Sequence, residues 1–297
     1  MDVAFLGLGN LGRAIARRIK NVFGDKINLY VWSRNYAKVE NFSSETLSIP
    51  LRNLSSIPGD VEIIFMCLFD SGAVQSVLEK INSEGKIIVD FTTNHPDKAI
   101  EFSKTLRERG GTYIESPVLG SVIPATEGKL TTLVAGEEIA YRRIEDFIKA
   151  ISSKIFYFGN NIPIASKFKL VNNLVLGGFM AVISEALAIG EKLNLPNDTL
   201  IDVLSHGAGR SSILEAKRSK LLNKDFSPHF SISLIRKDLD YLKDIASLGN
   251  LSSKMFLSLQ LYDLYDKARE KGLAQLDFSS IYLMFKKILN ECEKQEQ

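Results

Sequence analysis

The chain has 297 residues, of which 45% are hydrophobic, and its formal net charge at pH 7 is +2. This length and composition allow a large buried core and predict two domains. A charge near zero, with no long run of one sign in either half, argues against nucleic acid or an anionic membrane as the main partner.

The chain opens with an apolar strand that leads directly into a glycine-rich turn and then into residues with helical spacing, 13–19. The turn has the pattern G-x-G-x-x-G, in the sequence Gly7-Leu8-Gly9-Asn10-Leu11-Gly12. In such a turn Gly7 permits the sharp bend, Gly9 lets a pyrophosphate approach the backbone, and Gly12 lets the helix pack closely on the strand. The N–H groups and positive dipole end of the helix then hold the phosphates. A lone match is often an ordinary turn, but the strand, turn and helix together predict a dinucleotide site.

The end of the second strand, residues 27–32, indicates which dinucleotide binds. NAD sites usually carry a carboxylate about 20 residues after the glycines, to bond the ribose 2′-hydroxyl. This chain has Ser33 and Arg34 there instead. A guanidinium suits a 2′-phosphate because it offers paired donors and a permanent charge. We therefore expect NADP in preference to NAD, with Arg34 and Ser33 on the phosphate; the alternative is an exposed arginine that caps a loop.

Short apolar runs continue to alternate with amphipathic stretches up to about residue 160. Further strands are predicted at 61–68, 86–90, 112–115, 130–135 and 155–158, and helices at 73–78, 96–109 and 139–151. This alternation is typical of βαβ units on a parallel sheet. We predict an α/β fold in which residues 1–160 form a Rossmann-type, doubly wound parallel sheet domain that binds NADP.

Residues 161–297 are predicted to form an all-helical substrate and dimerisation domain. A helix-compatible segment spans about 163–193 and carries no charge between Lys169 and Glu185. That uncharged stretch is shorter than the roughly 20 apolar residues that a bilayer requires. We therefore expect a long central helix buried in a bundle or against a partner subunit, and no membrane span. Further helices are predicted, with breaks near Pro196, 207–209, Pro228 and Gly249.

Lys169 is the best candidate for a proton donor. Lysine is costly to bury in an apolar helix unless it is paired or useful, and Asn173 lies one turn further on the same face. An ammonium group there can polarise a carbonyl and donate a proton to its oxygen. The alternative is a surface lysine near a helix start, beside Lys167.

Two other segments are candidates for the site. Residues 115–121 follow a strand, where ligands of open α/β sheets bind, so Gly120 and Ser121 could present N–H groups and a hydroxyl to a carboxylate. The alternative is a plain turn. Lys237-Asp238, taken alone, is predicted to be a solvated helical face.

The remaining composition argues against other kinds of site. Only two cysteines are present, Cys67 and Cys292, so we expect no disulfide framework and a cytoplasmic location. Strand residues begin at once and Asp2 replaces a basic segment, so we expect no signal peptide. The three histidines are scattered without ligand partners at suitable spacing, so we expect no metal.

Together these pieces resemble the β-hydroxyacid dehydrogenase family, which includes 3-hydroxyisobutyrate dehydrogenase, and most of all its glyoxylate and succinic semialdehyde reductase branch. The resemblance covers nearly the whole chain. Besides the glycine turn, its elements are Trp32-Ser33-Arg34, Val89-Asp90-Phe91-Thr92-Thr93, Ser116-Pro117-Val118-Leu119-Gly120-Ser121, Lys169-Leu170-Val171-Asn172-Asn173, Lys237-Asp238 and Asp277-Phe278-Ser279.

The resemblance implies roles for individual residues. It implies that Lys169 is the catalytic lysine and that Asn173 orients the substrate, while Gly120 and Ser121 bind its carboxylate. It also implies that Thr93 and Lys237 lie along the nicotinamide half of the cofactor, with Leu68 near the ribose. A homodimer or homotetramer with the long helix between subunits is implied as well.

The chain departs from the family pattern at two places. Leu119 stands where the family usually has a serine bonded to the substrate carboxylate, and losing such a bond costs roughly 1.5–3 kcal/mol. Residues 163–165 replace the family's G-x-G before the lysine. These departures leave three functions open: an NADPH-dependent reductase of small aldehydes or 2-oxo acids (or the reverse oxidation of a β-hydroxy acid), an imine reductase, and a non-catalytic NADPH-binding scaffold or sensor. In the first of these, Arg210 in a glycine-bordered loop is a candidate replacement partner for the carboxylate.

Overall fold

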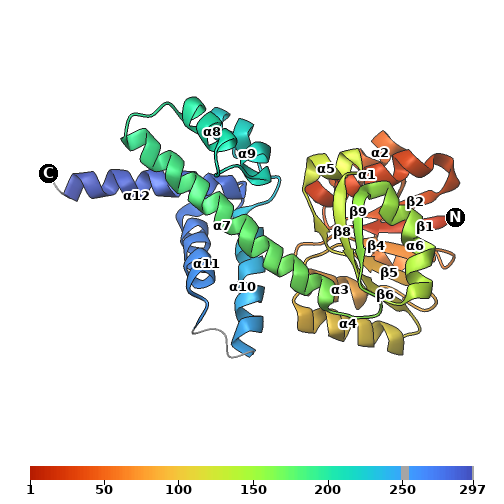
Figure 1. Cartoon of the computed structure of the whole chain (residues 1–297). Helices are drawn as coiled ribbons and strands as arrows, with labels where there is room; N and C mark the ends of the chain where they lie inside the picture. Colours follow the sequence, from red (N-terminus) through yellow and green to blue (C-terminus); the bar gives the residue numbers. More distant parts are fainter. Residues whose placement is uncertain (249–253, 296–297) are drawn as a thin grey trace. The chain divides into compact units, whose positions relative to one another are not determined.

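The computed structural model describes residues 1–248 and 254–295, with side chains described up to residue 289. The chain divides into two compact units, Met1–Lys169 and Leu170–Gln297 (Figure 1). The predicted boundary near residue 161 lies just before the helix that begins at Ile164, whereas the units divide inside this helix. The predicted break at Gly249 lies outside the described residues, as does the side chain of Cys292 on which the disulfide expectation depends.

A six-stranded sheet forms the centre of the first unit. Its strands are β1 (Asp2–Leu6), β2 (Asn28–Trp32), β3 (Ile49–Pro50), β4 (Ile63–Met66), β5 (Ile87–Asp90) and β6 (Thr112–Glu115). They lie in the order β3-β2-β1-β4-β5-β6, and every neighbouring pair is parallel. The strand order reverses at β1, which places the expected ligand crevice at the carboxyl ends of β1 and its neighbours.

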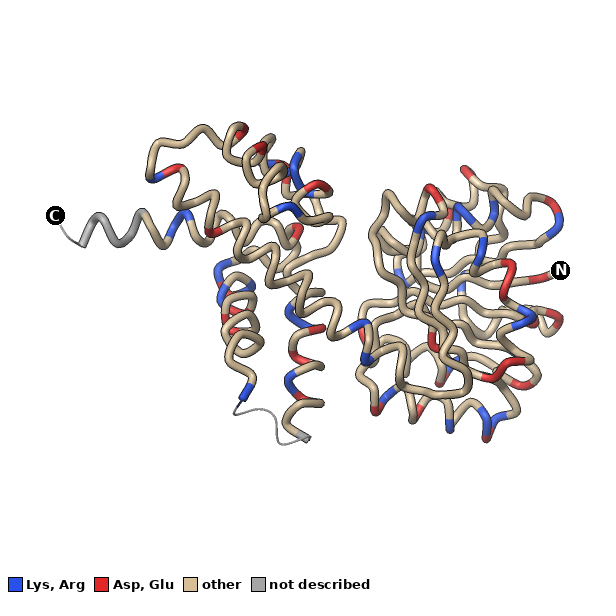
Figure 2. Tube along the Cα trace, viewed as in Figure 1, with Lys and Arg blue, Asp and Glu red and all other residues tan. Residues whose placement is uncertain are grey.

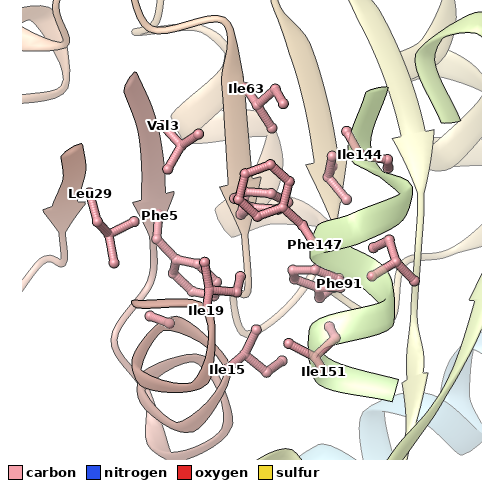
Figure 3. Packing of buried hydrophobic residues seen from close by; sticks show 14 of the residues in the cluster. Val3, Phe5, Ile15, Ile19, Leu29, Ile63, Phe91, Ile144, Phe147 and Ile151 are labelled. Atoms are coloured by element: carbon pink, nitrogen blue, oxygen red, sulfur yellow. The ribbon is translucent and has the colours of Figure 1, made fainter. Parts of the chain in front are cut away.

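Helices cover both faces of this sheet, as a doubly wound fold requires. One face packs against α1 (Asn10–Phe23), α2 (Tyr36–Thr46) and α6 (Glu138–Ile151), and the other against α3 (Ser71–Leu78) and α4 (Pro96–Glu108). Side chains alternate along β1, so Val3 and Phe5 join the first core, while Ala4 and Leu6 join the second. Figure 3 shows Phe5, Phe91 and Phe147 packed with Ile15 and Ile19 in the first core. The predicted Rossmann-type fold is confirmed.

The last strands of the first unit correct one expectation. We predicted that the βαβ units of the parallel sheet continue to about residue 160. Instead, the last strands form a separate sheet of β7 (Val118–Leu119), β8 (Leu130–Val134) and β9 (Ser152–Tyr157). β7 pairs antiparallel with β8, and β8 pairs parallel with β9. The reason is the short connection between β6 and β8, since residues 116–129 hold only the two-residue β7 and the six-residue helix α5 (Val122–Glu127) and cannot form a full crossover.

The elements α2, α5, β3 and β7 were not predicted from periodicity. The two residues of β3 and of β7 and the six of α5 are too few to display a period, whereas α2 has 11 residues. For α2 the signal was present, because the Asn35 side chain caps the helix by accepting a hydrogen bond from the Ala37 N–H at 3.1 Å.

The second unit is helical. Its elements are α7 (Ile164–Lys192), which begins in the first unit, α8 (Asn197–His206), α9 (Ser212–Asn223), α10 (Ile232–Leu248), α11 (Phe256–Ala268) and α12 (Ile281–Gln295). Short irregular turns, Arg269–Leu273 and Phe278–Ser280, lie between α11 and α12. Met180, Leu187, Ile235 and Tyr265 belong to a single apolar core drawn from these helices. The breaks predicted near Pro196, 207–209 and Pro228 all fall between helices.

The long helix predicted at 163–193 is α7. Its middle carries no charged residue between Lys169 and Glu185, so that part of the tube is tan in Figure 2, with no blue or red segment. By length and composition alone α7 could cross a membrane, and half of its most apolar window is buried. Core helices of soluble proteins pass the same test.

Candidate active site

The glycine-rich turn after β1 has the geometry that a dinucleotide needs. Gly7 has φ +108°, and a Cβ there would lie 2.3 Å from the Cys67 carbonyl oxygen. A Cβ on Gly12 would lie 2.1 Å from the Gly7 carbonyl oxygen, so this glycine allows α1 to pack against the turn. At Gly9 the situation is reversed, because a Cβ would meet nothing within 4 Å. Gly9 therefore faces open space, the position at which a pyrophosphate approaches the backbone.

The start of α1 also fits an anion electrostatically. The helix has Gly9 as its N-cap, no side-chain cap bond and no acidic residue in its first turn. Helix geometry leaves the first-turn N–H groups without carbonyl partners inside the helix, and Leu8 through Gly12 supply this backbone. The residues present therefore fit a bound dinucleotide phosphate.

The carboxyl end of β2 carries Ser33, which is partly buried, and Arg34, which is exposed. A second arginine, not singled out from the sequence, lies at the same edge. β3 pairs with β2, and the Leu51 N–H bonds the Val31 carbonyl oxygen at 2.9 Å, so Arg52 follows directly beside the end of β2. Its guanidinium lies 4.4 Å from the centroid of the Tyr36 ring. Among the described residues neither arginine pairs with a carboxylate. The position of Arg52 beside the end of β2 follows only from the pairing of the two-residue strand β3, so it could not be predicted from the sequence.

The loops after β4 and β5 are joined by a buried network. The Leu68 N–H donates to Thr92 Oγ1 at 2.9 Å, which joins Leu68, the predicted ribose position, to the loop that carries Thr93, the predicted nicotinamide position. Asp90 Oδ1 accepts from the Thr92 N–H at 2.9 Å, and its Oδ2 accepts from Asn94 and Tyr113 at 2.7 and 3.0 Å. Burial raises the pKa of Asp90, although these donors oppose the shift. The network holds the loop that carries Thr93, a partly buried residue.

The segment predicted to bind a carboxylate contains a short strand. Leu119 lies in β7 and packs on an apolar cluster that includes Leu133, Ala135 and Ala165. Gly120 follows with φ +114° and is exposed, and Ser121 is the N-cap of α5 without a side-chain cap bond. Leu119 thus has a packing role, which is a physical reason for an apolar residue at this position.

Lys169 and Asn173 lie one turn apart on α7. Lys169 is 8% exposed and Asn173 fully buried, so the alternative of a surface lysine is wrong. The neighbouring Lys167, in contrast, is exposed.

In the second unit Asn173 belongs to a buried polar cluster. Its Nδ2 donates to Asp238 Oδ2 at 2.5 Å, and Lys237 Nζ lies 3.0 Å from Asp238 Oδ1. Asp238 is 1% exposed and the Lys237 side chain 11% exposed. The expectation of a solvated face at Lys237-Asp238 is therefore wrong, because α10 turns this pair toward α7. Asp238, for which the sequence suggested no role, holds the Asn173 amide in place.

Arg210, the suggested carboxylate partner, already has a partner in the structure. Its Nε donates to Glu215 Oε1 at 2.9 Å, and its side chain is 71% exposed. No described contact brings it to the other candidate residues. Within the described ranges, no group of three or more His, Cys, Asp or Glu side chains is placed so that it could hold a metal ion.

Comparison with known proteins assigns both parts of the chain. Residues 2–159 match the model of the NAD binding domain of 6-phosphogluconate dehydrogenase. Residues 164–285 match the model of the NAD-binding domain of NADP-dependent 3-hydroxyisobutyrate dehydrogenase. The chain belongs to the β-hydroxyacid dehydrogenase family. Members of this family are NAD(P)-dependent oxidoreductases that act on hydroxyl or carbonyl groups, so this protein is such an enzyme.

Relatives cover almost all of this β-hydroxyacid dehydrogenase. Glyoxylate/succinic semialdehyde reductase 1 of Arabidopsis thaliana is 27% identical over 95% of this chain and 97% of its own length. The crystal structure of a 3-hydroxyisobutyrate dehydrogenase from Salmonella typhimurium has a TM-score of 0.87 at 21% identity, over 96% of this chain and 99% of that one. A Streptomyces aurantiacus imine reductase shares the fold at TM-score 0.65 and 18% identity, over 96% of this chain and 99% of that one.

Proposed function

We propose that this β-hydroxyacid dehydrogenase reduces small aldehydes or 2-oxo acids with NADPH and catalyses the reverse oxidation of the matching hydroxy acid. The observation that carries the proposal is the burial of Lys169 in an apolar stretch of α7, one turn from the buried Asn173. An ammonium group is costly to bury, and a proton donor for a carbonyl oxygen gives it a use.

The cofactor preference rests on the edge formed by Ser33, Arg34 and Arg52. NADPH, when bound, supplies the hydride. The two guanidinium groups, exposed beside the end of β2, offer paired donors and permanent charge to the 2′-phosphate. The Tyr36 ring holds Arg52 from one side. NAD has no group to satisfy these charges, so we infer a preference for NADP.

Lys169 is proposed to hold the proton of the reaction at Nζ. In the reductive direction it donates this proton to the carbonyl oxygen and stabilises the negative charge that develops there. Asn173 is proposed to orient the substrate, because its amide is held at both ends: its Nδ2 donates to Asp238, and its Oδ1 accepts from the Asn172 amide at 3.2 Å. Lys237 and Thr93 are proposed to lie along the nicotinamide, and Leu68 near its ribose.

The substrate is proposed to carry a carboxylate, bound by the backbone and hydroxyl of Gly120 and Ser121. Gly120 is exposed and in the left-handed region, and the Ser121 hydroxyl makes no cap bond. With Leu119 in place of a serine, we expect carboxylate binding to be weaker by roughly 10- to 100-fold than with a hydroxyl there.

A homodimer is proposed from the surface of α7. Val171, Val175, Phe179 and Val182 follow helical spacing and are each 50–65% exposed. A continuous apolar row of this kind on a soluble protein is typical of an interface. A second copy of the chain, with the same row, is the occupant we propose.

The test is NADPH oxidation by the purified protein on a panel of glyoxylate, succinic semialdehyde, uncharged aldehydes and a cyclic imine. Turnover on a carboxylate-bearing aldehyde supports the proposal. Turnover on the imine alone would favour imine reduction, which a positively charged Lys169 opposes because it repels an iminium ion. NADPH binding without any turnover would favour the scaffold or sensor function.

A further inference from the structure

Glu115 is a buried carboxylate that the proposed chemistry does not use. It ends β6 and is 1% exposed. Its Oε1 accepts a hydrogen bond from the Ser166 N–H at 2.9 Å, and its Oε2 accepts one from the Ser166 hydroxyl at 3.3 Å. The Ala165 N–H also donates to this carboxylate. All of these residues belong to the first unit.

Ala165 and Ser166 lie in the first turn of α7. N–H groups in a first turn have no carbonyl partner within the helix, and together they form the positive end of its dipole. Glu115 therefore caps α7 from a strand 51 residues earlier in the chain. Because its donors converge on a charged acceptor, these bonds are stronger than bonds between neutral groups.

The surroundings of Glu115 hold further titratable groups. Asp90 lies beside it in register on β5, and Tyr113 lies two residues before it on the same face of the sheet. Burial, and to a smaller extent repulsion from Asp90, raises the pKa of Glu115 to about 7, although the bonds from Ser166 and Ala165 oppose the shift. Tyr113 remains neutral, because burial and the two carboxylates raise its pKa well above 10. Glu115 thus changes its charge close to neutral pH.

We propose that Glu115 is a positioning residue, whose ionised carboxylate fixes the first turn of α7 and thereby the place of Lys169. Ser166 and Lys169 are three residues apart and share one face of the helix, so a shift of the first turn moves the lysine directly. Protonation removes the negative charge of Glu115 and turns one of its oxygens into a donor, so the bonds from Ala165 and Ser166 lose their charged acceptor and weaken. This inference rests on the proposed function, in which Lys169 is the proton donor.

The central experiment compares the pH profile of kcat in the parent, Glu115→Gln and Glu115→Asp, with Glu137→Gln, an exposed site, as the control. In the parent we expect kcat to fall as the pH drops through about 7, where Glu115 gains its proton. In Glu115→Gln this limb disappears and kcat at pH 8 falls by roughly 10- to 100-fold, since small misplacements of reacting groups cost that much. Glu115→Asp keeps the charge and should retain the limb, and the control should match the parent.

Stability separates positioning from a merely structural role. Since the folded protein raises the pKa of Glu115, the charged form disfavours folding above pH 7, and removing the charge relieves this cost. We expect Glu115→Gln to have a melting temperature at pH 8 at least as high as that of the parent, together with unchanged KM and NADPH affinity. A variant with lower stability but the parent's kcat and pH profile would overturn the proposal.

A second readout does not depend on turnover. Hydrogen exchange at the Ala165 and Ser166 amides, corrected for intrinsic rates, should show protection in the parent at pH 8 that weakens below pH 7 and is lost in Glu115→Gln. Unchanged protection in Glu115→Gln would show that Glu115 does not hold the first turn of α7. If protection is lost in Glu115→Gln but Lys169→Ala keeps full activity, Glu115 still holds the first turn of α7. The proposed function, in which Lys169 is the proton donor, would then be refuted.

Discussion

Arg34 and Arg52 lie at one edge of the sheet because β3 runs beside β2 and ends next to it. Each side chain is exposed and, in the described part of the chain, free of a carboxylate partner. Two positive side chains at one edge of the sheet make the local potential positive. A dianionic 2′-phosphate is attracted by this potential, whereas a neutral ribose hydroxyl is not.

Replacing Arg34 by alanine should therefore weaken NADPH binding by roughly 10- to 100-fold and leave NADH binding nearly unchanged, because it removes a charge-assisted contact. Arg52→Ala should have the same effect with smaller magnitude. Fluorescence titrations with NADPH and with NADH measure the two dissociation constants, and so the ratio of the two affinities in each variant. Equal losses of affinity for NADPH and for NADH would mean that these arginines do not bind the 2′-phosphate.

A buried ion pair in the second unit provides a prediction about stability. Lys217 Nζ lies 2.8 Å from Asp277, which also accepts the N–H groups of His229 and Phe230. Burial raises the pKa of Asp277, but the Lys217 ammonium, the Ser279 hydroxyl and the His229 N–H outweigh it and hold this pKa below its usual value. Asp277 therefore stabilises the fold above pH 4, near the unfolded pKa of about 3.9, and this contribution is lost as the pH falls through the lower folded pKa.

Lys217→Met leaves that carboxylate buried and unpaired, so we expect a loss of about 3–5 kcal/mol in the free energy of unfolding at pH 7. The exposed Lys267→Met serves as the matched control. Urea unfolding at pH 7 and pH 3 measures both. A loss that is as large at pH 3 as at pH 7 would show that the effect does not come from the charge on Asp277.

At the scale of elements, the glycine turn between β1 and α1 separates two roles that the sequence motif combines. Gly12 is required by packing, because a Cβ would meet the Gly7 carbonyl oxygen, whereas Gly9 faces open space. A substitution at Gly12 should therefore destabilise the fold, whereas a substitution at Gly9 should weaken only cofactor binding.

Gly9→Ala should keep the parent's melting temperature but weaken binding of NADPH by at least about tenfold, because its methyl group occupies the approach of the pyrophosphate. Gly12→Ala should lower the free energy of unfolding by about 1–3 kcal/mol through overpacking. Thermal unfolding without and with NADPH distinguishes the two. If Gly9→Ala bound NADPH as the parent does, the open space would not be the phosphate site.

The sequence predicted those elements whose signal is local and long. α7 was predictable because its helix-compatible segment is long, 29 residues in the structure, and β1 with its turn because strand, glycines and helix are contiguous. β3 and β7 have two residues each, so their pairing depends on tertiary contacts that no local pattern encodes. The burial of Lys237-Asp238 could not be predicted either, since it results from the packing of α10 on α7 around Asn173.

At the scale of the whole molecule, the apolar row on α7 determines the expected assembly. Its valines and phenylalanine remain exposed in the monomer although they lie on a long helix whose middle carries no charged residue. Burial of such a row in a second copy removes it from water and stabilises the association in proportion to the area covered.

Val175→Glu with Val182→Glu should therefore convert a dimer into a monomer, because two charges would have to be buried in the interface. Light scattering after size-exclusion chromatography gives the mass directly. Ile139→Glu, on an exposed position of α6, is the control and should keep the parent's mass. A dimer that survives both valine substitutions would place the interface elsewhere.

The measurement that tests the account most directly is hydride transfer from NADPH in a single turnover on a carboxylate-bearing aldehyde, compared between Lys169→Ala and Lys167→Ala. Both lysines lie on the first turns of α7, but only Lys169 is buried. We expect the rate constant to fall by roughly 100-fold or more in Lys169→Ala, the usual contribution of a general acid, and to stay unchanged in Lys167→Ala. Equal rates in the parent and both variants, with NADPH still bound, would contradict the assignment of Lys169 as the proton donor.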